Sequence, residues 1–71
     1  MVQNLPKLRR ELENQVLVRT GRRVQDLEVE LFPEHVIVRG RASTYHVKQL
    51  AQHGVRDLLP EIRLENAIVV G

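Results

Sequence analysis

The sequence predicts one α+β domain over residues 1–71, in which two helices pack on one face of a three-stranded sheet. Two segments carry apolar residues at three- and four-residue steps, which is the spacing of one face of a helix. Three further segments alternate between apolar and polar residues, as half-buried strands do. Glycine or proline interrupts the chain between most of these segments. The predicted order is therefore helix, strand, strand, helix, strand, or αββαβ.

The first helix is predicted over residues 5–20, "LPKLRRELENQVLVRT". Asn4 is the expected N-cap, and Pro6 is tolerated in the first turn because a backbone N–H there has no helical partner. Gly21 follows as the expected C-terminal stop. The apolar stripe that would face the core consists of Leu5, Leu8, Leu12 and Val16.

Two strands are predicted over residues 24–31 and 36–41, separated by "FPEH", because Pro33 cannot donate to a strand ladder. A hairpin with Leu31 opposite Val36 fixes the remaining register. The other pairs would be Val29–Val38 and Leu27–Gly40 on the inner face, with Glu28–Arg39 and Asp26–Arg41 on the outer face. Facing opposite charges support a sheet, so this register gives both arginines of "RGR" a structural role.

The second helix is predicted over residues 43–58, with Ser43 as its N-cap and Pro60 beyond its end. Its buried stripe would be Val47, Leu50, Ala51, Gly54, Val55 and Leu58. The last strand is predicted over residues 62–70 and would point Ile62, Leu64, Ile68 and Val70 inward. Asn66 falls on the same inner side, where its amide needs hydrogen-bond partners.

Composition restricts the classes of function. A chain of 71 residues has few side chains to spare for a deep catalytic cavity. It has no cysteine, which excludes a disulfide and a thiolate metal site. A net charge of +2 is a mild basic bias, below what nucleic-acid-binding chains usually carry. No apolar run approaches the length of a membrane-spanning helix, and the N-terminus lacks the apolar core of a signal peptide.

The stretch "LEVELFPEHVIVRGRAST", followed by an alanine-centred helix and a closing apolar strand, resembles the BON domain, a small αββαβ module of bacterial envelope proteins. The resemblance covers nearly the whole chain. The family's strand pattern, roughly V-x-L-x-G-x-V-x-S, is met here by Val36, Val38, Gly40, Ala42 and Ser43, and a later Val-x-Asn step by Leu64 and Asn66.

The chain departs from that family at three places: Pro33-Glu34-His35 replaces the turn glycine, Tyr45 and His46 replace acidic residues, and "LLPEI" replaces a Gly-Val step. The resemblance implies a non-enzymatic binding module linked to phospholipid surfaces. It also implies a place in the periplasm or the cell envelope.

Three other chemistries are weighed against simpler interpretations. A phosphate-binding loop needs several glycines, whereas "RGRAST" has one, so we interpret Gly40 as the place where a helix packs closely on the sheet. His46, His53 and Asp57 share a helix flank and could supply metal ligands, but surface positions with a His53–Asp57 contact are the simpler interpretation. His35 is interpreted as a solvated loop residue. Ser43 lacks a His–Asp partnership, so no enzymatic function and no cofactor are predicted.

The surplus positive charge lies on the helices and their ends. Tyr45 shares an exposed helix side with Lys48 and Arg56, and a tyrosine beside cations suits a lipid headgroup interface. A solvated charged face is the alternative interpretation. The candidate contacts for lipid or another anion are Arg19, Arg22, Arg23, Tyr45, Lys48 and Arg56.

We therefore expect a binding module for an anionic phospholipid surface or an envelope partner. The alternative is a docking or self-association domain that uses the apolar last strand at an exposed sheet edge, with another protein or further domains of a longer chain as partner. Nucleic acid is a less favoured partner, because the G-x-x-G clamp of KH-type folds is missing and Phe32 and Tyr45 are too few for a stacking platform.

Overall fold

The computed structural model describes residues 5–71 and confirms the αββαβ order. The elements are α1 (Leu5–Thr20), β1 (Val24–Leu31), β2 (His35–Ala42), α2 (Tyr45–Leu58) and β3 (Arg63–Val70). The expected cap at Asn4 and the side chain of Leu5 lie outside what the structure describes. The second helix begins two residues later than predicted, and the second strand is one residue longer at each end.

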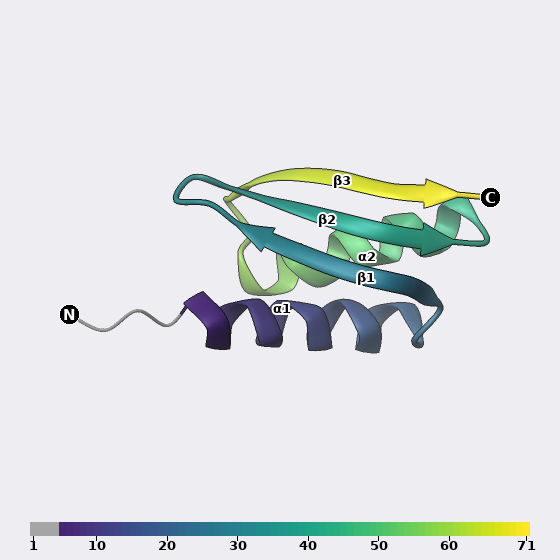
Figure 1. Ribbon diagram of the computed structural model, residues 1–71, viewed down its shortest axis with the longest axis horizontal. Coiled ribbons are helices and arrows are strands. Elements are labelled where there is room, and N and C mark those ends of the chain that lie inside the picture. Colours follow the sequence, from purple (N-terminus) through teal and green to yellow (C-terminus); the bar gives the residue numbers. More distant parts are fainter. Residues whose placement is uncertain (1–4) are drawn as a thin grey trace.

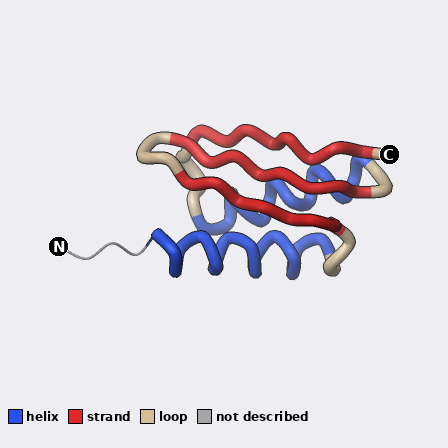
Figure 2. Tube along the Cα trace, viewed as in Figure 1, coloured by secondary structure: helices blue, strands red, loops and turns tan. Residues whose placement is uncertain are grey.

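The sheet has the strand order β1-β2-β3, with β1 antiparallel and β3 parallel to the central strand β2. Both helices lie on one face of this sheet, as predicted, and the opposite face is open (Figure 1; Figure 2). The sequence left the position of the last strand undecided, and the structure places it beside β2. As a result β1 and β3 are both edge strands.

The core lies between the helices and the inner face of the sheet. Leu8, Leu27, Leu31, Leu59, Ile62 and Leu64 pack around it while keeping part of their surface exposed. Leu58 was predicted to be buried but is 41% exposed, whereas its neighbour Leu59 packs against the core. The buried apolar side chains are Leu12, Val16, Val24, Val29, Val36, Val38, Ala42, Val47, Ala51, Val55 and Ile68.

The buried stripe of α1 continues one turn further than the apolar residues suggested. Thr20 follows Leu12 and Val16 at four-residue steps and is fully buried. Its hydroxyl donates to the Val16 carbonyl at 2.8 Å, which satisfies the group without another partner. Gly21 then ends the helix in the left-handed conformation (φ +62°), and the Arg22 N–H donates to the Leu17 carbonyl, as in a Schellman cap.

A β-bulge in β1 corrects the predicted hairpin register. Leu31–Val36, Val29–Val38 and Glu28–Arg39 pair as expected, but Gln25 rather than Asp26 lies opposite Arg41. Asp26 and Leu27 together therefore stand opposite the single residue Gly40. Asp26 adopts a left-handed backbone (φ +55°), as the first residue of a G1 bulge does. The extra residue lets both Val24 and Leu27 turn toward the core.

Gly40 makes room for this bulge, and not for a helix as the sequence had suggested. A Cβ atom at Gly40 would lie 2.9 Å from the Gln25 carbonyl oxygen and 2.9 Å from Val24 Cγ1. Its φ of +154° is also a conformation that side chains disfavour. Bulge and glycine are therefore a matched pair, one on each strand.

The N-cap of α2 is Thr44 instead of the predicted Ser43. Thr44 has extended backbone angles, and its hydroxyl accepts a hydrogen bond from the Val47 N–H at 3.2 Å. The cap shifts by one residue because β2 runs on through Ala42, which leaves Ser43 in the connection between strand and helix.

The two helices touch through their backbones at Gly54. A Cβ atom there would lie 2.9 Å from Val16 Cα and 3.1 Å from the Gln15 carbonyl oxygen. Asn66 on β3 finds the hydrogen-bond partners that its inward position requires. Its amide donates to the Lys48 carbonyl at 2.8 Å, and its carbonyl oxygen accepts from the Ile68 N–H at 3.2 Å.

Replacing Gly54 by alanine is expected to destabilise the protein by about 1–3 kcal/mol, because the methyl group forces α1 and α2 apart. Helix propensity alone predicts the opposite sign, a gain of up to about 1 kcal/mol. Urea unfolding followed by circular dichroism measures the difference. Gln49→Ala, at an exposed position of the same helix, is the control and should be neutral or slightly stabilising. A stabilised Gly54→Ala protein would contradict the close crossing.

The bulge makes a second prediction at Asp26. Asp26→Gly should leave the free energy of unfolding unchanged or raise it slightly, because glycine adopts the left-handed conformation freely. Asp26→Val should lower it by about 1–3 kcal/mol, since a β-branched residue is strained there. The same unfolding curves test both variants. If valine were tolerated as well as glycine, the bulge would have to be absent in solution.

Candidate functional site

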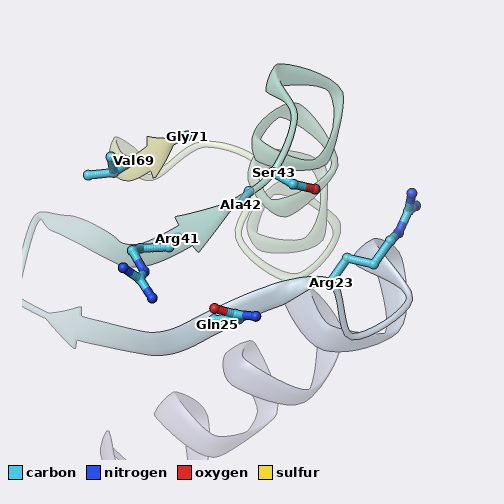
Figure 3. A pocket seen from close by; sticks show the side chains of 7 residues that line it. All are labelled: Arg23, Gln25, Arg41, Ala42, Ser43, Val69 and Gly71. Carbon is cyan, nitrogen blue, oxygen red and sulfur yellow. The ribbon is translucent and has the colours of Figure 1, made fainter.

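One end of the domain brings three segments together around an open pocket of about 400 Å³. The α1–β1 turn contributes Arg23, the end of β2 contributes Arg41 and Ala42, and the end of β3 contributes Val69 (Figure 3). Gln25, Ser43 and Gly71 complete the lining. The lining thus holds two guanidinium groups and a hydroxyl, with no carboxylate side chain among the described residues.

Arg41 is available in this pocket because of the bulge. The sequence assigned it to a pair with Asp26, but its partner in the ladder is the neutral Gln25. Arg39, the other arginine of "RGR", does form an ion pair, although with Glu30 at 3.2 Å instead of the predicted Glu28. Within residues 5–71, Arg41 makes no salt bridge and its side chain is exposed. Only one of the two arginines therefore has the structural role that was predicted for it.

Ser43 is available for a similar reason. Because Thr44 caps α2, the Ser43 hydroxyl is not used as the cap and lies exposed at the pocket. Arg23 is partly fixed, since its Nε donates to the Thr20 carbonyl at 2.7 Å at the end of α1. The guanidinium groups of Arg23 and Arg41 point away from each other on opposite sides of Gln25 (Figure 3). The pocket therefore offers positive charge over an area and does not focus it on one point.

A second pocket of about 400 Å³ lies at the other end of the sheet. Among the described residues Arg9 is its one cation, and Glu30 in the same lining carries the opposite charge. Phe32 in its wall stacks on His35, with ring centroids 4.6 Å apart. His35 is thus the half-buried first residue of β2, and not the solvated loop residue that was expected. The mixed charge makes this pocket a weaker candidate for an anionic ligand.

The six candidate residues from the sequence fall into separate environments, and Arg23 is the one that lines the basic pocket. Arg22 is exposed in the same α1–β1 turn, and Tyr45 is 63% exposed at the start of α2. Arg19, Lys48 and Arg56 lie elsewhere. The sequence missed Arg41 and Ser43 because both had an apparent structural role, and the alternating pattern gave no sign of an extra residue in β1.

Arg19 connects the two helices through Asp57. Its Nε lies 2.6 Å from Asp57 Oδ2 and its Nη2 lies 2.9 Å from Oδ1, while Gln15 Nε2 donates to Oδ2 at 2.9 Å. The hydrogen bonds from Arg19 and then from Gln15 hold the pKa of Asp57 well below its usual range. The same pairing raises the pKa of Arg19. Arg19 therefore serves the packing of α1 against α2.

The opposite flank of α2 carries Lys48 and Arg56 beside β3. The Lys48 carbonyl accepts the Asn66 amide, and Arg56 Nη1 donates to the carbonyl oxygens of Pro60 (3.3 Å) and Ile62. These contacts fix the connection between α2 and β3. They also place two positive charges next to an edge strand and away from the basic pocket.

The histidines do not assemble a metal site. Asp57, the third ligand considered from the sequence, is bound by Arg19 and Gln15 instead of by His53. His46 and His53 are exposed on α2. In the part of the chain that the structure describes, no three histidine, aspartate or glutamate side chains gather closely enough to hold a metal ion.

The Asp57 contacts predict an acid-dependent loss of stability. Because folding lowers the pKa of Asp57, its contacts stabilise the folded protein fully above about pH 4, where a free carboxyl group is ionised. This stabilisation is lost as the pH falls toward the lowered pKa that Asp57 has in the folded protein. Asp57→Asn should therefore lower the melting temperature at pH 7. The difference in melting temperature between the variant and the native protein should shrink between about pH 4 and pH 2. Glu61→Gln, at an exposed loop carboxylate, is the control. A deficit that stays constant with pH would contradict the ion pair.

Comparisons with known proteins identify no relative. Neither the protein-family models, nor the curated proteins, nor the solved structures include a match to this chain. Among residues 5–71 no helix is long and apolar enough to span a membrane. The structure shows a small αββαβ fold with a mixed three-stranded sheet and a basic pocket at one end.

Proposed function

We propose that this chain is a non-enzymatic binding module that engages anionic phospholipid surfaces through its basic end. We define the basic end as Arg22, Arg23, Arg41 and Ser43. The observation that carries the proposal is the pocket in which Arg23 and Arg41 stand without a carboxylate side chain beside them. Arg22 adds a third exposed cation in the adjoining turn.

The geometry favours a surface with several anionic groups over a single bound anion. A phosphate held at one point needs donors that converge on it, as bidentate arginine pairs do. Here the two guanidinium groups point apart, and the pocket between them is open. Each cation near an anionic membrane contributes about 1 kcal/mol, so three contribute about 3 kcal/mol, roughly a hundredfold in the binding constant. Such binding is reversible and weakens with salt.

Tyr45 suits this surface as an interfacial anchor. It begins α2 two residues after Ser43 and is 63% exposed. A tyrosine ring can enter the headgroup region while its hydroxyl remains hydrated. The resemblance to BON domains supports the same class of ligand, because it implies phospholipid surfaces and a place in the bacterial envelope.

A nucleic-acid module is the less favoured function. Single-stranded nucleic acid needs aromatic side chains with free faces beside a basic groove. Phe32 already stacks on His35 at the end of the sheet that carries the second pocket. Tyr45 is then the one aromatic side chain near the basic end, which is too few for a row of stacked bases.

Co-sedimentation with vesicles that contain phosphatidylglycerol tests the proposal at two salt concentrations. The protein should bind at low ionic strength, and Arg23→Gln with Arg41→Gln should weaken binding about thirtyfold, the effect of losing two interfacial cations. Lys7→Gln with Arg10→Gln is the matched control, because it removes the same charge from the exposed first half of α1. Thermal unfolding shows whether the two double variants are folded.

Three results would reject the proposal. Failure of the native protein to bind phosphatidylglycerol vesicles at low salt would exclude a lipid-surface module for this chain. Equal weakening by the two double variants would mean that net charge, and not the basic end, drives adsorption. Binding of similar strength to neutral vesicles would likewise remove the role of the arginines.

A further inference from the structure

β3 is an edge strand whose second half lacks most of the features that usually protect an edge, although the Ile68 N–H on that side already donates to Asn66 Oδ1. It pairs with β2 on one side, and no strand of the described chain pairs with its other side (Figure 1). Residues 66–70, "NAIVV", carry no charge, no proline and no bulge. Val69 is 61% exposed and Val70 is 40% exposed, one on each face of the sheet. This edge can therefore accept a further strand.

The flank of α2 beside this edge is cationic. Lys48 and Arg56 lie on the side of the helix that meets β3, as their contacts with Asn66 and Ile62 show. Helical spacing puts Tyr45 and Gln52 on the same flank. The carboxylate of α2, Asp57, belongs to the other flank and is held by Arg19 of α1. The inner side of the edge thus has positive charge and one aromatic ring.

We propose that the free edge of β3 binds an extended acidic peptide segment as a fourth strand. Backbone hydrogen bonds to β3 would hold the segment, and its alternate side chains would face opposite sides of the sheet. Acidic side chains on the helix side would lie near Lys48 and Arg56. Apolar side chains on the open side would lie beside Ala67 and Val69, which are uncharged.

Charge repulsion disfavours a second copy of this chain as the fourth strand. Antiparallel pairing of β3 with β3 about a two-fold axis near Asn66 would bring the two Lys48 residues together, because Lys48 contacts Asn66. The cationic flanks would then face each other, which disfavours the dimer. An acidic segment makes the same backbone bonds and neutralises the flank.

An NMR titration with amide hydrogen exchange tests this at low salt without any lipid. The probe is an acetylated and amidated octapeptide of alternating glutamate and valine. The amides of β3 that point to the free edge should exchange more slowly when the peptide is added, apart from that of Ile68, which already donates to Asn66 Oδ1. Lys48→Gln should weaken binding about two- to fivefold. The matching lysine–valine octapeptide should not protect β3.

Three results would overturn the inference. The first is that amide exchange in β3 stays unchanged at about 1 mM acidic peptide. Any binding would then be weaker than a dissociation constant of about 1 mM, which is a binding free energy of about 4 kcal/mol. The second is equal protection by the lysine–valine peptide, which would remove the charge argument. The third is protection of β3 that rises with protein concentration without peptide, which would identify a second copy as the occupant. None of these results depends on whether the basic end binds lipid.

Discussion

The close approach of α1 and α2 at Gly54 is the contact on which the rest of this small fold depends. A chain of 71 residues has one thin core, so its two helices must pack tightly to cover one face of the sheet. The backbone of Val16 fills the space that a side chain at position 54 would occupy. Arg19 and Gln15 then bind Asp57 one turn beyond the crossing, which secures the same pair of helices with polar contacts.

Covering one face leaves the opposite face of the sheet open, with β1 and β3 as its edge strands. The two surfaces proposed above adjoin at the end of β3, because Val69 lines the basic pocket and also lies on the strand edge. The basic end is formed by chain connections and strand ends, where backbone irregularity sets which side chains are free. The β3 edge is formed by regular backbone that pairs with no other strand of the described chain on that side.

The basic end shows how a local irregularity leaves charged and polar side chains exposed together. Gly40 allows β1 to carry an extra residue, and that residue moves Asp26 out of register with Arg41. Without the bulge, Arg41 would face a carboxylate and its charge would be neutralised. The same end of β2 continues through Ala42, which gives the capping role to Thr44 and leaves the Ser43 hydroxyl exposed. Two small backbone shifts therefore expose a guanidinium and a hydroxyl together.

The sequence by itself determined the element order, the bounds of α1 and β1, and most of the buried positions, because hydrophobic periodicity is a local property that each segment carries alone. Tertiary structure decided the place of β3 at an edge, the bulge opposite Gly40, and the cross-helix partner of Asp57. Each of these depends on what lies across from a residue and not beside it in the chain. That is why Arg41 and Ser43 could not be found from the sequence: whether a side chain is free is settled by its neighbours in space.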